Sequence, residues 1–290
     1  MQRPPRLVSP SLRPGPALAA GLACAVGMGL TAPAAIAESP PDKPPPPGLT
    51  LGQGKLNVAV NLELELSQDR VGKPFSISPD VSYGVTPDLT VALVHSRFAT
   101  TGFRAAAGGG LCLAGDDGGC VAVYNNVGLE GWYSVARGPT SIAVGGGVHA
   151  LNLDAGFYNL KLGARLRHVA GKLGFHALPS VIVAVTERDD GAGNRLNKDT
   201  LWVPVQVTYN LAPLTVGLGT GVKGALSGFG DAYQIPLGFM ALYAVDKTTT
   251  VGASWVFGQV ISGATNPPDP SPPVEGFALR GVQLWGSRTF

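Results

Sequence analysis

The amino-acid sequence predicts an all-β fold, a transmembrane antiparallel up-and-down β-barrel of about twelve strands. Three observations support this prediction. Apolar and polar residues alternate at period two over segments much longer than an ordinary strand of about five or six residues. Long and short connections between these segments alternate along the chain. The composition, with 41 Gly, 25 Pro and only 14% charged residues, favours strands over helices.

The first 37 residues have the features of a secretory signal peptide, and we expect residues 1–37 to be removed. Arg3, Arg6 and Arg13 give a positively charged start, and an apolar stretch rich in small residues follows. The tripeptide AIA at 35–37 matches an A-x-A cleavage site. A membrane anchor formed by the same stretch, or lipidation at Cys24, is the alternative interpretation.

Removal of this leader changes the charge of the chain. The sequence has 21 basic and 19 acidic residues, and three of the basic residues but none of the acidic ones lie within 1–37. The remainder therefore has 18 basic and 19 acidic residues, a net charge of −1. This balance gives no support for a nucleic-acid partner.

Residues 38–53 are predicted to be a Pro-rich linker that precedes one barrel domain at 54–290. The stretch ESPPDKPPPPG at 38–48 is unsuited to helix or sheet, because proline lacks a backbone N–H and fixes φ. After the linker, the sequence has no run of roughly 18 unbroken apolar residues, the length that a membrane-spanning helix needs.

Alternation predicts the strands one after another along the domain. The clearest case is 54–66, where apolar residues from Leu56 to Leu66 alternate with Asn, Ala and Glu. Each predicted strand is at least as long as the roughly 9 to 11 residues that a tilted strand needs to cross a bilayer core. The twelve segments are 54–66, 74–86, 88–98, 120–135, 140–152, 157–169, 172–186, 199–211, 213–226, 232–245, 248–261 and 276–290.

The connections separate into two classes. The tight turns are TPDL at 86–89, ARGP at 136–139, VAGK at 169–172, NLAP at 210–213 and VDKT at 245–248. The longer polar connections are 67–73, 99–119, 152–157, 187–199, 226–231 and 262–276. Short turns on one side and long loops on the other are the layout of a membrane barrel. An even number of strands places both ends of the barrel domain on the short-turn side.

The leader, the alternating strands, the turn and loop asymmetry, runs such as VSYGVTPDLTVAL and the C-terminal Phe290 together resemble Gram-negative outer-membrane β-barrel proteins of the porin-like or channel type. These motifs are generic and do not name one family. The resemblance implies a bacterial outer-membrane location, outer-membrane lipids as partners and both termini in the periplasm. It also implies that the barrel-insertion machinery reads Phe290 as an insertion signal. Arg288 departs from the usual signal, because an apolar residue is typical two positions before the end.

If the apolar face of each strand meets lipid, the alternate face lines the lumen, and its charged and histidine residues are the candidate functional residues. The candidates are Glu63, Glu65, Asp80 and Glu130 on early strands, Lys161, Arg165, Arg167 and Lys223 on later strands, and His149 and His176. Acids on one arc and bases on another predict a transverse field that orients polar solutes in a pore. The alternative is that these charges pair and fill the interior.

Glycine and cysteine residues lead to two further expectations. Lumen-side glycines such as Gly145, Gly147 and Gly217 either leave room for water or relieve crowding where the wall bends. Cys112 and Cys120 are predicted to form a disulfide in an exported loop. A metal site at this pair is the alternative, but the nearby sequence offers no His or further Cys to complete a tetrahedral set.

The sequence predicts a passive channel or porin-like transporter for small solutes, not an enzyme, with no cofactor and no metal. A structural or surface-exposed barrel with a filled lumen, whose loops such as 99–119 and 262–276 bind partners, is the alternative. A soluble exported β-protein and an outer-membrane lipid hydrolase are weaker alternatives. His95 beside Ser96 suggests the hydrolase, but neighbours on a strand point to opposite faces and do not act together as base and nucleophile.

Overall fold

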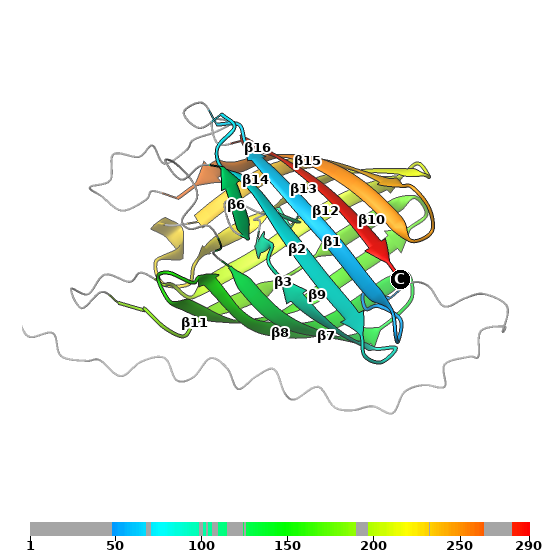
Figure 1. Cartoon of the computed structure of the whole chain (residues 1–290), viewed down its shortest axis with the longest axis horizontal. Helices are drawn as coiled ribbons and strands as arrows, with labels where there is room; N and C mark the ends of the chain where they lie inside the picture. The colour runs from blue at the N-terminus through cyan, green and yellow to red at the C-terminus, as the bar shows by residue number, and fades with distance from the viewer. Residues whose placement is uncertain are drawn as a thin grey trace, which may run out of the picture. The chain divides into compact units, whose positions relative to one another are not determined.

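A computed structural model gives the structure of the chain. It describes residues 48–67, 71–98, 101–102, 104–105, 110–114, 124, 126–189, 197–231, 233–263 and 280–290. The predicted leader at 1–37 and most of the predicted linker at 38–53 lie outside these ranges. Within them, no helix is long and apolar enough to cross a membrane. The described residues form a closed antiparallel β-barrel (Figure 1).

The barrel wall has twelve strand positions. The main sheet holds 14 strands, and two positions are each shared by a pair of strands, which leaves twelve. The positions are β1 (Leu56–Glu65), β2 (Phe75–Gly84), β3 (Leu89–Val94) with β6 (Leu111–Ala114), β7 (Val127–Ala136), β8 (Thr140–Asn152), β9 (Phe157–Ala170), β10 (Leu173–Ala177) with β11 (Ser180–Ala184), β12 (Thr200–Asn210), β13 (Leu214–Ala225), β14 (Tyr233–Ala244), β15 (Thr249–Ser262) and β16 (Arg280–Thr289). The predicted fold and strand number are confirmed.

The first and last strands close the wall. β1 pairs with β16 from Asn57 opposite Thr289 to Glu65 opposite Gly281, and with β2 on its other side. The side chains of Asn57 and Thr289 are also hydrogen-bonded, at 3.0 Å from Nδ2 to Oγ1. Closure matters because an open edge in a lipid bilayer leaves backbone groups without hydrogen-bond partners.

The two faces of the wall differ in the way that the alternation predicts. Large apolar side chains point outward and are exposed all round the barrel, among them Leu129, Tyr133, Val144, Leu162, Val207, Phe239 and Trp255. Small and polar side chains such as Asn61, Ser76, Ser78 and Ser141 point inward and are buried. This distribution is the reverse of a soluble protein, and it suits a barrel surrounded by lipid.

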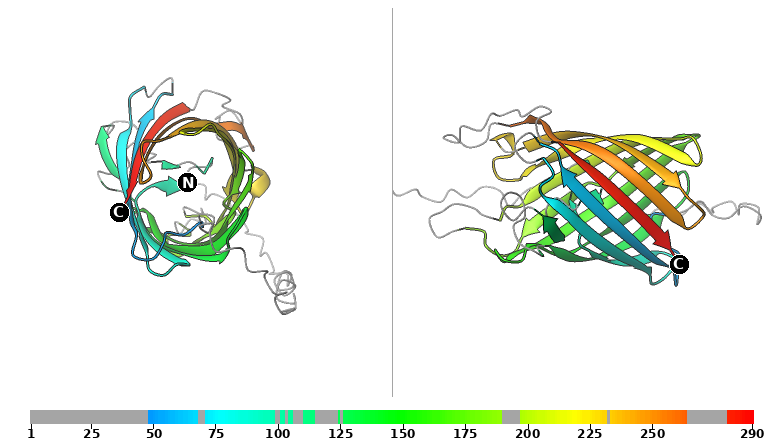
Figure 2. Two further views of the ribbon diagram at one scale, coloured as in Figure 1. Left: turned by 90° about the vertical axis from the view of Figure 1, so that its right-hand side faces the viewer. Right: turned by 45° about the horizontal axis from the view of Figure 1, so that its top comes forward.

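The third wall position differs from the predicted strand at 88–98. β3 ends at Val94, and the chain then turns into the lumen, where β4 (Arg97–Phe98) and β5 (Arg104–Ala105) form a separate two-stranded sheet. Figure 2 shows these short strands inside the ring of long ones. β6 then resumes pairing on the same edge of β2, opposite Phe75 to Ile77. The chain therefore leaves the wall and returns to the same position.

The predicted strand at 172–186 is broken. β10 and β11 lie in line between β9 and β12, and Leu178 and Pro179 separate them. Pro179 has no N–H to donate to a neighbouring strand, which explains the interruption. Between β13 and β14 the chain forms a short 3-10 helix, η1 (Phe229–Asp231).

Candidate functional site

The candidate site is defined by the inward faces of the wall strands and by the described residues between β3 and β6 that lie inside the ring, 95–98, 101–102 and 104–105, which we call the internal segment. The predicted candidates share this inward face: Glu63 and Glu65 on β1, Asp80 on β2, Glu130 on β7, His149 on β8, Lys161, Arg165 and Arg167 on β9, His176 on β10 and Lys223 on β13. The structure brings four of them into one cluster and separates the rest.

Glu130 is the centre of this cluster, and only 4% of its surface is exposed. Its Oε1 lies 2.8 Å from Lys161 Nζ and 3.2 Å from His149 Nε2. Its Oε2 lies 3.3 Å from an Arg165 guanidinium nitrogen and accepts a 2.7 Å hydrogen bond from Trp132 Nε1. One buried carboxylate thus holds an ammonium, a guanidinium, an imidazole and an indole N–H, which satisfies a group that is costly to bury alone.

The strand between the partners makes this cluster possible. Glu130 and Lys161 both lie opposite Gly147 of β8, so the ion pair forms across a strand that has no side chain at that level. The two tryptophans Trp132 and Trp202 flank Lys161, with its Nζ 5.4 and 5.0 Å from their ring centroids. The Arg165 guanidinium carbon lies 4.0 Å from the Trp132 centroid. These cation–π contacts fix both cations against the wall.

The glycine run at 145–147 is explained by crowding. A Cβ added to Gly145, Gly146 or Gly147 would lie 2.1, 1.9 or 2.1 Å from a backbone carbonyl oxygen of a neighbouring strand. Real Cβ atoms do not approach other atoms so closely, so these positions require glycine. The space on the lumen side is taken by the side chains of Glu130, Lys161 and Trp132 from β7 and β9.

Asp80 serves as an anchor for the segment that enters the lumen. Its Oδ1 accepts hydrogen bonds from the backbone N–H groups of His95 at 2.7 Å and Ser96 at 3.0 Å. Its Oδ2 accepts one from the Ser96 hydroxyl at 2.6 Å. The His95 carbonyl accepts a bond from the Asn126 side-chain amide. His95 and Ser96 are therefore held where β3 ends, and the Ser96 hydroxyl donates to a carboxylate, not to the His95 imidazole.

The internal segment reaches the far wall. Gln206 of β12 donates a 3.1 Å hydrogen bond from Nε2 to the carbonyl oxygen of Thr101, which is fully buried. A Cβ added to Gly102, which has a φ of 74°, would lie 2.8 Å from Pro204 Cβ. β5 lies beside β1 and β16. Because β3 and β12 stand on opposite sides of the ring, the segment crosses the lumen (Figure 2).

The remaining candidates lie apart from the cluster. Glu65, at the long-loop end of β1, accepts a 3.0 Å hydrogen bond from the Ser67 N–H. Arg167 lies 3.4 Å from the Ser141 hydroxyl. Glu63 and Lys223 face inward on β1 and β13, and neither is isolated.

The predicted disulfide remains a prediction. Cys112 lies on β6, at the point where the chain has returned to the wall beside β2. Cys120 lies outside the described residues, so the pairing is not tested.

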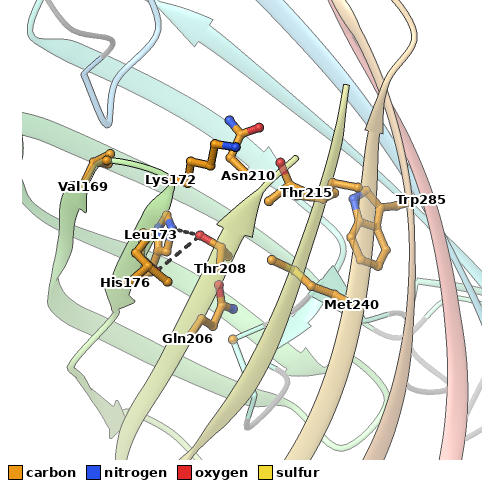
Figure 3. Close-up of a pocket in the computed structure, with 14 residues that line it drawn as sticks. Val169, Lys172, Leu173, His176, Gln206, Thr208, Asn210, Thr215, Met240 and Trp285 are labelled. Carbon is orange, nitrogen blue, oxygen red and sulfur yellow. Dashed lines mark hydrogen bonds between the residues drawn. The ribbon is translucent and has the colours of Figure 1, made fainter. Parts of the chain in front are cut away.

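A cavity of about 380 Å³ lies in the lumen at the short-turn end. Gly102 of the internal segment lines it, and β9, β10, β12, β13, β14 and β16 contribute the rest of its wall. Figure 3 shows Lys172, His176, Gln206 and Thr208 on one side and Met240 and Trp285 on the other. His176 is the one predicted candidate that lines it.

Sequence reasoning missed most residues of this cavity. Gln206, Thr208 and Met240 carry no charge and so are not among the predicted candidates, although they occupy inward positions of their strands. Trp285 lies on a mixed face of β16 beside Gln283, which is buried and bonded to Ser254 at 3.0 Å. These residues could have been predicted as those at inward-facing strand positions opposite inward-facing glycines.

Comparison with known proteins bears on the fold. Neither a protein-family model nor a curated protein sequence matches the chain. Among solved structures, the NanC porin is similar with 12% identity and a TM-score of 0.54, over 80% of this chain and 98% of that one. An outer membrane channel from Pseudomonas putida F1 is similar with 13% identity and a TM-score of 0.46, over 87% and 100% of the two chains.

The structure and the first of these likenesses define a class of fold. The chain forms a closed antiparallel β-barrel with an apolar outer face and a polar inner face, and it shares its fold with the NanC porin. The predicted resemblance to outer-membrane β-barrels is therefore confirmed at the level of the fold. At 12% identity the likeness carries no information about a solute.

Proposed function

We propose that this protein is a passive channel of the bacterial outer membrane that admits small solutes and is not an enzyme. The observation that carries this proposal is the lumen cavity of about 380 Å³, which lies within a closed barrel whose outer face is apolar. A cavity of this size inside the wall is room that side chains leave for water and solute. On this proposal the short turns and both termini face the periplasm.

The internal segment gives the channel its constriction. It is tied to the wall by Asp80 at its start and by Gln206 at Thr101. Along β12, Trp202 lies beside Lys161 of the Glu130 cluster, Gln206 binds the segment, and Thr208 lines the cavity. Solutes would pass beside the segment, and its position sets the width available to them.

Ion conductance tests the proposal. Purified mature protein, refolded in detergent and inserted into planar lipid bilayers, should produce discrete current steps at a fixed membrane potential. Boiled protein and detergent alone are the controls. A folded barrel, verified by heat-modifiable mobility on a gel, that inserts and passes no current would refute a channel.

A structural barrel is the second candidate, and one observation favours it. The cluster of Glu130, Lys161, Arg165 and Trp132 fills part of the lumen with paired, buried groups. Such packing stabilises a barrel without serving transport. Folded protein that binds lipid and resists denaturation but carries no current would support this candidate over the first.

A further inference from the structure

We propose that the lumen cavity at the short-turn end binds a small planar solute that has an apolar ring and a negatively charged edge, an aromatic carboxylate being the simplest case. The inference deepens the proposed channel function by naming a class of solute. Transport of this solute depends on the proposed channel function. Binding does not, because it can be measured in protein that carries no current.

One wall of the cavity is an apolar platform made by Met240, Leu242 and Trp285. The Trp285 ring lies flat across Gly252 of β15, since a Cβ added there would lie 2.4 and 2.6 Å from two atoms of the indole. The same Cβ would lie 2.7 Å from a methyl of Leu242, so the two side chains lie together over that glycine. An indole held flat against a wall presents its face to the lumen, and aromatic solutes stack on such a face.

A second glycine flattens the rest of this platform. A Cβ added to Gly217 of β13 would lie 2.9 Å from the terminal methyl of Met240 and 3.1 Å from the methyl of Thr208. Met240 therefore covers the wall instead of projecting across the lumen. Its flexible thioether chain makes favourable contacts with aromatic rings.

The adjoining part of the wall, on β10 and β12, is polar and bears positive charge. His176 lies over Gly174, and its Nε2 is 3.3 Å from Thr208 Oγ1. Gln206 lies beside them, and Lys172 stands at the mouth in the turn between β9 and β10. The described residues that line the cavity include no Asp or Glu. An anionic group is therefore favoured at this wall over a cationic one.

The volume and the position of the cavity limit the size of the solute. A volume of about 380 Å³ is at the small end of the usual range of roughly 300 to 1,000 Å³ for ligand sites, so it suits a single ring with one polar substituent. Gly102 lines the cavity, so a solute there rests against the internal segment. Figure 3 shows the polar side chains of His176, Thr208 and Gln206 beside the apolar side chains of Met240 and Trp285 along the same curved wall.

Calorimetric titration of the folded protein in detergent tests the inference, with benzoate as the probe. Acetate has the charge without the ring, and benzyl alcohol has the ring without the charge. We expect benzoate to bind more tightly than either. Acetate binding as tight as benzoate, or no benzoate binding at all, would overturn the proposal.

Variants measure the contributions of the apolar platform and of the polar residues to benzoate binding separately. Trp285→Leu should weaken benzoate binding by about three- to tenfold, and Trp285→Phe should retain most of it because a ring remains. Trp255→Leu, on the exposed outer face, is the matched control and should change nothing. Unchanged binding in folded Trp285→Leu would refute a role for the platform.

Lys172→Gln should weaken benzoate binding about two- to fivefold, as expected for an exposed charge pair, and leave benzyl alcohol binding unchanged. Lys247→Gln, in another exposed short turn, is the control. Equal losses for both probes, or none for benzoate, would refute the charged edge. Benzoate binding without conductance would support this inference and refute the proposed channel. Conductance without benzoate binding would support the channel and refute this inference.

Discussion

Glu130 and Lys161 meet because Gly147, on the strand between them, has no side chain at their level. The pairing is buried, with both residues 4% exposed. A residue-scale rule follows for this wall, in which a large inward side chain on one strand is matched by glycine on the next. Trp285 over Gly252 and Met240 over Gly217 repeat it in the lining of the cavity.

Replacing the central carboxylate should be costly. Glu130→Gln keeps the size of the side chain and leaves the buried Lys161 ammonium without its negative partner, so we expect a loss of about 3 kcal/mol or more in the free energy of unfolding. Denaturant titration in lipid vesicles measures it. Asp88→Asn, which breaks the exposed pair with Arg137 at 2.7 Å, is the control and should cost about 0–1 kcal/mol. Equal losses for the two variants would contradict a stabilising role for the cluster.

The crowding at β8 gives a second residue-scale prediction. Gly147→Ala places a Cβ 2.1 Å from the Leu129 carbonyl oxygen, so backbone has to move, and we expect a destabilisation of about 1–3 kcal/mol. Gly131→Ala is the matched control, because nothing lies within 4 Å of the added Cβ and the cost should stay within about 0.5 kcal/mol. The same denaturant titration compares them, and similar stabilities would contradict the explanation.

At the scale of the element, the internal segment is a detour of the third wall strand that Asp80 and Gln206 hold in place. Gln206→Ala removes the hydrogen bond to Thr101 and should raise single-channel conductance, because the segment is released from the far wall. Gln283→Ala removes another inward amide, bonded to Ser254, and serves as the control. A Gln206→Ala current no larger than that of the control would show that the internal segment does not determine the width of the lumen available to ions.

The turn between β14 and β15 predicts a dependence on pH. Asp246 accepts hydrogen bonds from the N–H and hydroxyl of Thr248 and from the Thr249 N–H, and these bonds lower the pKa of its carboxyl from 3.8 to about 2. The ionised turn therefore stabilises the fold above about pH 4 and loses that contribution as pH falls toward 2.

Asp246→Asn keeps an acceptor oxygen and removes the titrating group. Wild type should be the more stable of the two near neutral pH, and the difference should shrink as pH falls from about 4 to about 2. Unfolding followed across that range measures it. A difference that is constant with pH would contradict the assignment.

Much of the element scale was predictable from the sequence, and the reason is the alternation. The wall of the barrel keeps the alternation over most of its length, so β8 matches its predicted range 140–152, and Gly171 and Lys172 form the turn expected within 169–172. Parity assigns faces but not partners, so it could not reveal that Glu130 meets Lys161 across Gly147. It also did not place the detour: the apolar parity of Leu89, Val91 and Leu93 ends at His95, but the residue that draws the backbone inward there, Asp80, lies on another strand.

At the scale of the whole molecule, Phe290 extends the strand pairing that closes the barrel by one more residue pair. The Phe290 N–H donates to the Leu56 carbonyl at 2.7 Å, and the Leu56 N–H donates back at 3.3 Å. The Phe290 ring is 58% exposed on the rim of the barrel, and the Arg288 guanidinium carbon lies 5.3 Å from its centroid. The backbone of Phe290 thus takes part in closure, and its exposed side chain is the part that the predicted insertion signal concerns.

Two variants separate these roles. Deletion of Phe290 removes both hydrogen bonds and the ring, whereas Phe290→Ala removes the ring alone. We expect deletion to lower the folded fraction in lipid vesicles without any insertion machinery, and Phe290→Ala to refold there but assemble poorly in cells. Heat-modifiable mobility measures both. Normal outer-membrane assembly of the deletion variant would refute the predicted insertion signal.

The detour between β3 and β6 has a consequence for how such a barrel can change over evolutionary time. The chain leaves the wall after Val94 and rejoins the same edge of β2 from Leu111. An insertion or deletion between these points alters what lies inside the ring without adding a strand, shifting a register or moving either terminus. The width of the lumen can therefore change without a change in the wall strands. We expect related sequences to vary in length between Val94 and Leu111 more readily than at any short turn.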